Sequence, residues 1–451
     1  METRDVDNGF PPALHANHAT FSMPTTISVL ENSLIGSLEQ WTESPKNGLL
    51  VPDTVFQVLR RFVFEQEDAE GLLAFSIQKG RELIQVRQYV GLLPITPQTQ
   101  LEILPKIGPI DQARARLLTM LRQLRHSPFR TLPDAQTQAI SLPLWEVFMA
   151  TFLDTVEPLV RQGIQHAYVL EESNERYWKG KFQATRQQRE NAWHAERLAV
   201  IHDTLTADVA ANRILKTLLN YLAGETKNPG TLRRISQLVW AMDEVPISDV
   251  LADDFRLIRR SGRLFRRYET ALHWAEALAY GRGYGVKTGA TPNLALLFPM
   301  ERVFEDHVTH GVRTYWPESD EVRIQESSAH LVDEHIGMPK FKLRPDVIIR
   351  HNTHTLVLDM KWKSINAAEP NRSQRMGNYG IEQADLYQLY AYGKKYNADN
   401  LFLIYPASET FQHPLPVFDY DATTRLHIWP FDLTNSLANE VEKLATYAFS
   451  H

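Results

Sequence analysis

The sequence predicts a multidomain α+β protein with a β-rich N-terminal domain, a helical centre and a C-terminal α/β domain. Its 451 residues are more than one hydrophobic core usually supports. Before residue 110 the pattern is that of short apolar strands and turns. In the next part, apolar residues recur at helical spacing, and after it predicted helices and strands alternate. The expected parts are a disordered tail at 1–22, a β-rich domain at 23–109, a helical middle region at 110–285 and an α/β domain at 286–451.

The N-terminal part contains one expected helix and one clear hairpin. The helix is predicted near Asp53–Phe64. The hairpin is the segment ELIQVRQYVGLLPITPQTQLEILPKIG, residues 82–108, in which two apolar strands flank a Pro/Thr/Gln turn. Pro94 and Pro97 are expected to mark the break between the strands because proline removes a backbone donor.

The middle region shows apolar residues at three- and four-residue spacing, which predicts helices. The clearest helical segments are ARARLLTMLRQL, LPLWEVFMATFLDTVEPLVRQGI and ANRILKTLLNYLAG. A Gly/Thr-rich stretch at 281–293 is interpreted as the linker into the last domain. Beyond it we expect a helix at about 296–309, several strands, a helix at about 381–396 and a strand at 401–406.

Composition excludes several classes of protein. The chain has no cysteine, which excludes thiolate catalysis, disulfides and cysteine-ligated zinc or iron–sulfur sites. No apolar run approaches the roughly 18–20 residues of a membrane helix, and the N-terminus lacks a basic-then-apolar signal pattern, so we expect a cytoplasmic protein without membrane contact. The net charge is -6, so any DNA contact must come from local patches.

The most informative stretch is LRPDVIIRHNTHTLVLDMKWK, residues 343–363. Two apolar runs separated by HNTH predict an antiparallel hairpin. If the loop is 351–354, Arg350 pairs with Thr355 and Asp346 lies opposite Asp359. Opposed side chains lie about 5 Å apart at Cβ, so two carboxylates there require a positive charge between them. A divalent cation is the simplest candidate.

Alternation along the second strand places Asp359 and Lys361 on the same face, about 6.6 Å apart. A cation held by Asp346 and Asp359 binds a phosphate oxygen and lowers the pKa of a water, while Lys361 orients that water or neutralises developing charge. The competing interpretation is a set of solvated charges on an exposed strand. The pattern alone leaves the two interpretations near even.

Pro345–Asp346, followed by Asp359–Met360–Lys361, resembles the PD-(D/E)XK nuclease superfamily. Downstream, Gln388 and Tyr392 resemble the Q-x-x-x-Y motif of its RecB-like branch, although a core tyrosine is the simpler interpretation of Tyr392 alone. Upstream, Glu305 is in the place of a supporting acid, with Glu301 and Asp306 as rivals. The resemblance implies a restriction-endonuclease-like fold in the C-terminal domain. It also implies a catalytic set and, within it, ligands for Mg²⁺ or Mn²⁺. The catalytic set is Asp346, Asp359, Lys361, Glu305, Gln388 and Tyr392, and the metal ligands are Asp346, Asp359 and Glu305.

Four further segments, at 86–108, 163–182, 207–219 and 297–308, resemble the McrC family. This resemblance implies the nuclease subunit of a modified-cytosine-dependent restriction system, cutting double-stranded DNA with a McrB-like AAA+ GTPase hexamer that recognises the modified base. It also implies that the N-terminal region docks with this motor. There, Arg87, Glu102 and Lys106 near the hairpin ends are the predicted partner-binding residues; the alternative is that these three charges only keep the hairpin soluble. No G-x-x-x-x-G-K-[ST] occurs, so we expect no nucleotide bound by this chain.

Several basic residues are candidates for DNA contact. Six arginines lie in the segment 255–268, where an ion-paired helix face is the slightly favoured alternative. Lys363, Lys340 and Lys342 lie nearer the predicted site and are the preferred DNA-binding residues. The sixteen histidines form no H-E-x-x-H pattern. The rival function is a nuclease fold kept as a silent scaffold that activates a partner NTPase.

Overall fold

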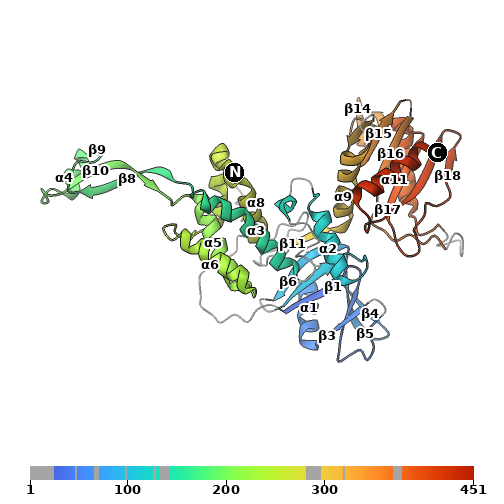
Figure 1. Cartoon of the computed structure of the whole chain (residues 1–451), viewed down its shortest axis with the longest axis horizontal. Coiled ribbons are helices and arrows are strands. Elements are labelled where there is room, and N and C mark those ends of the chain that lie inside the picture. Colours follow the sequence, from blue (N-terminus) through green and yellow to red (C-terminus); the bar gives the residue numbers. More distant parts are fainter. Residues whose placement is uncertain are drawn as a thin grey trace.

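The computed structural model shows an extended molecule with the C-terminal sheet at one end and, at the other, a thin arm that projects from the helical part, while the N-terminal sheets lie between these ends (Figure 1). It describes residues 25–45, 48–65, 71–96, 99–124, 128–132, 142–280, 296–317, 320–352, 354–368 and 378–450. The strands of these residues form five sheets. The mixed architecture confirms the predicted α+β class. The tail at 1–22, the stretch at 281–293 and the predicted boundary at 286 lie outside the described residues.

The N-terminal end is built from two four-stranded sheets, in the orders β1-β7-β6-β11 and β3-β2-β5-β4. Their elements are β1 Thr25–Leu30, β2 Leu34–Ser37, β3 Gly48–Val51, α1 Asp53–Glu65, β4 Leu73–Gln78, β5 Arg81–Val86, β6 Tyr89–Thr96, β7 Thr99–Leu104 and β11 Leu296–Pro299. Phe56 and Leu59 of α1 are buried against these sheets, which confirms the predicted helix.

The hairpin predicted at 82–108 is correct in its second half only. Its first apolar run is two strands, β5 and β6, which belong to different sheets. Pro94 was expected in the break but lies inside β6, where it pairs with Gln100. β11 pairs with residues 89–92 only, so at Pro94 β6 has a neighbour on one side only, and proline is tolerated at such an edge. Pro97 lies outside the described residues.

The segment 296–309 was predicted to be helical from its start, but it begins with a strand. β11 pairs antiparallel with β6 of the N-terminal sheet, and α9 Met300–Tyr315 begins only after Pro299. All side chains from Leu296 to Phe298 are buried, as in a strand covered on both faces. Gly91 permits this pairing: its φ is 122°, and a Cβ there would lie 1.9 Å from the carbonyl oxygen of Leu296.

The helical middle is confirmed for the three segments that predicted it. Its helices are α2 Ile110–Leu121, α3 Leu144–Arg161, α5 Ala210–Glu225, α6 Pro229–Ala241, α7 Leu251–Ser261 and α8 Glu269–Tyr280, with 3-10 turns at Pro128–Thr131 and Gly262–Tyr268. They surround a core centred on Phe148, Phe152 and Trp274. The side chain of Trp274 packs edge-on against Phe129 at 5.0 Å between ring centroids.

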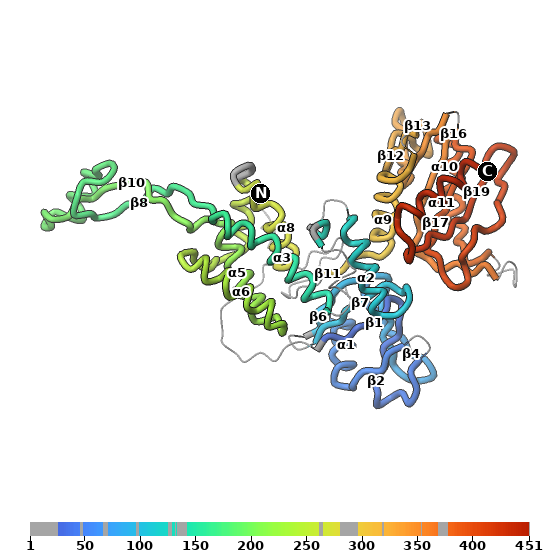
Figure 2. The backbone as a smooth tube through the Cα atoms, in the orientation of Figure 1, coloured from blue at the N-terminus to red at the C-terminus, as the bar shows by residue number. Residues whose placement is uncertain are grey.

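The same region also contains a sheet that the sequence did not reveal. β8 Ala167–Glu175 and β10 Leu198–Thr206 pair along their whole length, with β9 Lys181–Phe182 and α4 Ala184–Glu190 at the tip. Figures 1 and 2 show that this hairpin extends from the helices as an arm. Most side chains of β8 are exposed, and the buried residues of β10, Ala199, Val200 and His202, do not alternate along the strand, so the apolar alternation that reveals a half-buried strand is absent.

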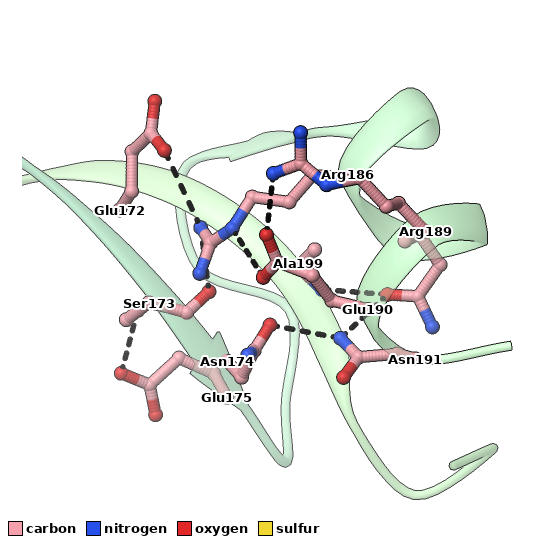
Figure 3. Close-up of polar contacts among 10 residues, drawn as sticks. Glu172, Ser173, Asn174, Glu175, Arg186, Arg189, Glu190, Asn191 and Ala199 are labelled. Carbon is pink, nitrogen blue, oxygen red and sulfur yellow. Dashed lines mark hydrogen bonds and ion pairs between the residues drawn. The ribbon is translucent and has the colours of Figure 1, made fainter. Parts of the chain in front are cut away.

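The tip of the arm is held together by polar contacts (Figure 3). Arg186 of α4 pairs with Glu172 of β8 at 3.8 Å, and Nδ2 of Asn191, directly after α4, donates to Oδ1 of Asn174 of β8 at 2.8 Å. These contacts tie α4 to β8 without a large apolar core. Aromatic side chains remain on the surface, with Trp178 65% and Trp193 95% exposed.

The C-terminal end is a six-stranded sheet in the order β12-β15-β16-β17-β19-β18, with β16, β17 and β19 parallel. Its strands are β12 Glu321–Ile324, β15 Val347–His351, β16 His354–Met360, β17 Asn400–Pro406, β18 Phe418–Asp421 and β19 Thr424–Phe431, and β13 His330–His335 pairs with β14 Met338–Lys342 in a separate ribbon. Helices α9 and α11 Leu437–Ser450 pack together beside one face, and α10 Gln383–Tyr396 packs on β16 and β17.

One continuous core joins these parts. It runs from Val90 and Leu104 in the N-terminal sheet, through the helices, to Leu358 in the C-terminal sheet. Among the described helices, none is both long enough and apolar enough to cross a bilayer.

Candidate active site

Asp346 and Asp359 face each other where β15 and β16 begin to separate. Arg350 pairs with Thr355 and Val347 with Leu358, as the predicted register requires, so Asp346 and Asp359 are the next opposed positions. The strands extend one residue further toward the turn than expected, with His351 opposite His354. The backbone N–H of Met360 donates to Oδ2 of Asp346 at 2.8 Å. The hairpin therefore brings the two carboxylates together.

Lys361 lies beside Asp359, as the alternation of β16 predicts. Leu356, Leu358 and Met360 enter the core on the α9 side, while Val357 packs in the core on the α10 side. Nζ of Lys361 is 2.9 Å from Oδ2 of Asp359. Apart from this ion pair, the buried Oδ2 has no partner among the described residues. A carboxylate oxygen has lone pairs for more than one contact, so Oδ2 can accept a further ligand beside Lys361.

The surroundings of the two carboxylates shift their pKa values upward. Burial, followed by the charges of Asp359 and Glu305, raises the pKa of Asp346 well above its usual value. Burial also raises the pKa of Asp359, although the charge of Lys361 opposes the shift. Burial alone would lower the pKa of Lys361, but the charge of Asp359 outweighs it and raises that pKa. Lys361 is therefore a cation at neutral pH and not a proton acceptor.

Glu305 lies near this pair but is held by another side chain. Its charge acts on both aspartates, whereas its rival Glu301 acts on Lys361; the other rival, Asp306, is buried. Oε1 of Glu305 accepts a 3.0 Å hydrogen bond from Gln325. Within the ranges that the structure describes, no three acidic or histidine side chains are grouped as a complete ligand set.

The donor set nevertheless fits a hard divalent cation. Asp346 and Asp359 offer only carboxylate oxygens, one of which is buried with no contact beyond the ion pair to Lys361 among the described residues, and oxygen is the ligand that Mg²⁺ prefers. Mg²⁺ usually retains several waters and one or two protein carboxylates, so a complete protein cage is not required. A cation between the two groups also offsets the repulsion that raises the pKa of Asp346.

Gln388 and Tyr392 reach the site from α10. Nε2 of Gln388 donates to the hydroxyl of Tyr392 at 2.6 Å, and Tyr392 is buried. Burial raises the pKa of Tyr392, the bond from Gln388 opposes the shift, and the charges of Asp359 and Asp346 add to it. The structure thus brings this pair together with the two aspartates and Lys361.

The three lysines expected to contact DNA differ in their surroundings. Nζ of Lys363 lies 2.8 Å from Asp385 and 3.0 Å from Glu382 at the start of α10. These two acids neutralise it, so Lys363 is a poor choice for a phosphate contact. Lys340 and Lys342 lie on β14, partly and fully exposed, in the ribbon that precedes Asp346.

The three residues predicted to bind a partner differ in their exposure to solvent. Arg87 and Lys106 are exposed. Glu102 is fully buried: its carboxylate accepts hydrogen bonds from Arg114 at 2.7 and 2.9 Å, from Ser28 at 2.6 Å and from the backbone N–H of Leu144 at 2.9 Å. The assignment of Glu102 to a partner surface was therefore wrong for this conformation, because the strand register turns it toward α2.

Two residues near the site were missed from the sequence. Asp385 is buried, and its charge raises the pKa of Asp359. Gln325 has a positive φ of 48°, and its backbone N–H donates to the carbonyl oxygen of Asp346 at 2.8 Å. A helix-start aspartate and a lone glutamine carry no distinctive pattern, and only the fold places them here.

The arginine-rich segment at 255–268 is partly ion-paired within the chain. Arg256 pairs with Asp253 at 2.7 Å, Arg259 pairs with Glu276, and Arg267 donates to the carbonyl oxygen of Gly163. These contacts favour the interpretation of an ion-paired helix face over that of a DNA patch.

Comparison with known proteins agrees with this architecture. Residues 84–406 match the model of the McrBC 5-methylcytosine restriction system component family. A refined half-complex from a tetradecameric assembly of Thermococcus gammatolerans McrB AAA+ hexamers with bound McrC contains a chain of similar fold. The TM-score is 0.67 at 18% identity, covering 94% of this chain and 100% of the other. The Thermococcus gammatolerans McrBC complex gives a TM-score of 0.49 at 19% identity, covering 65% and 89%. No curated protein sequence matches. Since the family match covers well over half of the sequence, the chain belongs to the McrBC 5-methylcytosine restriction system component family.

Proposed function

We propose that this chain is the DNA endonuclease subunit of a GTP-dependent restriction complex, and that it cuts double-stranded DNA at the site formed by Asp346, Asp359 and Lys361. The observation that carries the proposal is the opposed pair of carboxylates with Lys361 ion-paired to one of them. Two like charges buried away from water are unfavourable without a cation between them, which supports a metal site.

Asp346 and Asp359, supported by Glu305, would hold Mg²⁺ or Mn²⁺. When bound, the cation supplies Lewis-acid polarisation of a phosphate oxygen and activates water. Asp346 is kept in place by the N–H of Met360. Lys361, protonated at neutral pH because of Asp359, donates to the phosphate oxygen or to the attacking water and offsets charge as the phosphorane forms.

Gln388 and Tyr392 act from α10 as donors. The raised pKa of Tyr392 keeps its hydroxyl protonated, so it offers a hydrogen bond and not an oxyanion. In this proposal Tyr392 orients the phosphate or Lys361, and Gln388 fixes the hydroxyl. Lys340 and Lys342 on the neighbouring ribbon are the proposed phosphate contacts outside the reacting bond.

An AAA+ GTPase hexamer is the proposed partner, and it recognises the modified cytosine and supplies the nucleotide energy. This rests on the family and on the similar fold of a McrC chain bound to McrB hexamers. Arg87 and Lys106 are candidate contacts, because both are exposed on the N-terminal domain. The arm is a second candidate, because exposed aromatic rings on a projecting hairpin are typical of a binding surface.

The decisive experiment combines the chain with its AAA+ partner, Mg²⁺ and GTP, and compares cleavage of cytosine-methylated and unmodified duplexes. We expect cutting of the methylated duplex only, and none with the Asp359→Asn variant. The isolated chain should hydrolyse neither GTP nor ATP, so that nucleotide turnover depends on the partner.

The alternative is a silent scaffold that activates the partner. The observation in its favour is that the described residues do not group three acidic or histidine side chains into a ligand set. Wild-type chain that stimulates the GTPase but leaves every duplex intact, with Mg²⁺ or Mn²⁺ present, would establish the scaffold and overturn the nuclease.

A further inference from the structure

A buried hydrogen bond joins the N-terminal domain to the residue that follows Lys361. Glu31 comes directly after β1, and its Oε1 accepts a 2.7 Å hydrogen bond from Nε1 of Trp362. The same oxygen accepts from the backbone N–H of Lys106 at 3.2 Å. Glu31 is 1% exposed and Trp362 7%. This contact spans more than three hundred positions of sequence and lies within the core.

We infer that Glu31 is a positioning residue for the proposed active site, which it serves by holding Trp362 and thereby the end of β16 that carries Lys361. The inference rests on the proposed function. It assigns to the first strand of the chain a role in the chemistry of the last domain.

Other contacts also hold Trp362 and its neighbours in place. Lys361 precedes Trp362, and its backbone N–H donates to the carbonyl oxygen of Ile404 on β17 at 2.9 Å. The indole packs against Phe304 of α9 at 5.3 Å between ring centroids, and Phe304 precedes Glu305. β16 ends at Met360, so Lys361 lies beyond the last ladder residue of its strand. Its backbone depends on these flanking contacts for a fixed position.

The hydrogen bond to Glu31 is the polar part of this anchor. A buried indole N–H without an acceptor is unfavourable, so removing the carboxylate favours a movement of Trp362 toward another acceptor or water. A displacement of 1 Å at a reacting group is enough to lower a rate by about a hundredfold. The effect of Glu31 on the reaction is therefore expected in the turnover step and not in DNA binding.

Glu31 also has a free oxygen and an unusual acidity. Its Oε2 is buried without a hydrogen-bond partner among the described residues. Burial raises the pKa of Glu31 to about 7, opposed by the hydrogen bonds from Lys106 and Trp362 and by the charge of Lys106. A carboxylate accepts more strongly than a carboxylic acid, so the anchor strengthens as pH rises through about 7.

The test uses the full chain with its AAA+ partner and measures kcat and KM for methylated DNA. Glu31→Ala and Trp362→Phe each remove one side of the bond, and the phenylalanine keeps an aromatic ring in the core. We expect kcat to fall about tenfold or more in each, with KM and stimulation of the partner GTPase unchanged. The double variant should be no slower than the slower single variant, because both lesions remove one interaction.

Glu31→Gln is the rescue variant, since its amide oxygen still accepts from the indole. It should keep kcat within about threefold of wild type at pH 8, and it should lose the part of the pH dependence near 7 that wild type shows. Trp429→Phe is the matched control: Trp429 is also 7% exposed in the same sheet, and its buried Nε1 has no hydrogen-bond partner among the described residues. Glu146→Gln, a buried carboxyl in α3, controls for loss of a buried acid. Both controls should retain wild-type kcat.

A resonance that does not depend on cleavage completes the test. In protein labelled with 5-fluorotryptophan, the fluorine NMR resonance that is missing from the Trp362→Phe variant belongs to Trp362. The chemical shift of this resonance should change near pH 7 in wild type and stay constant in Glu31→Gln. Normal kcat in Glu31→Ala or Trp362→Phe, additive losses in the double variant, or a signal that still titrates in Glu31→Gln would overturn the inference. A wild-type complex that never cuts DNA would overturn the proposed function itself.

Discussion

Gln388 and Tyr392 form a hydrogen bond of 2.6 Å across one turn of α10, and the same spacing recurs at Gln383 and Tyr387 on the exposed side of that helix. Tyr392 is buried beside the aspartates, whereas Tyr387 is 66% exposed. One helix therefore carries two chemically identical pairs, of which only one reaches the proposed site.

Tyr392→Phe should lower the cleavage rate about tenfold, the effect of one hydrogen bond of about 1.4 kcal/mol. Tyr387→Phe, its matched control, should leave the rate unchanged. The measurement is single-turnover cleavage of methylated DNA with the partner present. Equal effects of the two substitutions would remove Tyr392 from the catalytic set.

Asp346→Asn should reduce cleavage by more than about a hundredfold and, at the same time, stabilise the metal-free chain. The physical reason is that Asp346 is buried opposite a like charge, which raises its pKa. Removing one charge relieves that repulsion by about 1 kcal/mol. Denaturant unfolding in EDTA measures the second effect. Added Mg²⁺ should stabilise wild type but not the variant, and a variant destabilised in EDTA would contradict the like-charge interpretation.

The metal-free chain should lose stability as pH rises from about 5 to 8 because of Glu31. Its folded pKa, about 7, lies above the ordinary 4.5, so the folded state binds the proton more tightly than the unfolded chain. The stabilisation from this proton is fully present below pH 4.5, the ordinary pKa of the group, and is lost as pH rises through about 7. The loss of unfolding free energy is on the order of 2–3 kcal/mol. Asp346 shifts in the same direction, so the informative quantity is the difference between wild type and Glu31→Gln. Parallel pH profiles of unfolding free energy would contradict the prediction.

Glu102→Ala should lower the free energy of unfolding by about 3–5 kcal/mol, because the buried Arg114 loses its two short bonds to the Glu102 carboxylate. Arg87→Ala and Lys106→Ala, which change exposed side chains, should alter it by less than about 0.5 kcal/mol. The proposed docking role of the latter two is tested by stimulation of the partner GTPase. A stable Glu102→Ala protein with reduced stimulation would restore Glu102 to the partner surface.

The hairpin of the proposed site could be predicted because its information is local. Two β-branched runs and a short polar loop determine the register, and the register determines that Asp346 opposes Asp359. The helices could be predicted for the same reason, since the spacing of their apolar residues reflects one buried side. The roles of Glu102 and Lys363 could not, because their ion-pair partners, Arg114 and Asp385, are set by tertiary packing.

The division of the chain was harder to predict than its elements. The expected boundary between residues 109 and 110 is crossed by pairings within the described residues. A chain lacking residues 1–109 would lose β6, the partner of β11, together with Glu31, the partner of Trp362. Strand pairing between residues about 200 positions apart leaves no trace in local periodicity.

The pairing of β11 with β6 also sets an order for biosynthesis. β6 ends at Thr96 and β11 begins at Leu296, so a ribosome adding about 5–20 residues per second exposes an unfinished sheet for roughly 10–40 s. During that interval the edge of β6 offers free backbone groups to any other strand. A chaperone that shields this edge until residue 299 emerges would therefore favour the pairing of β11 with β6 of the same chain.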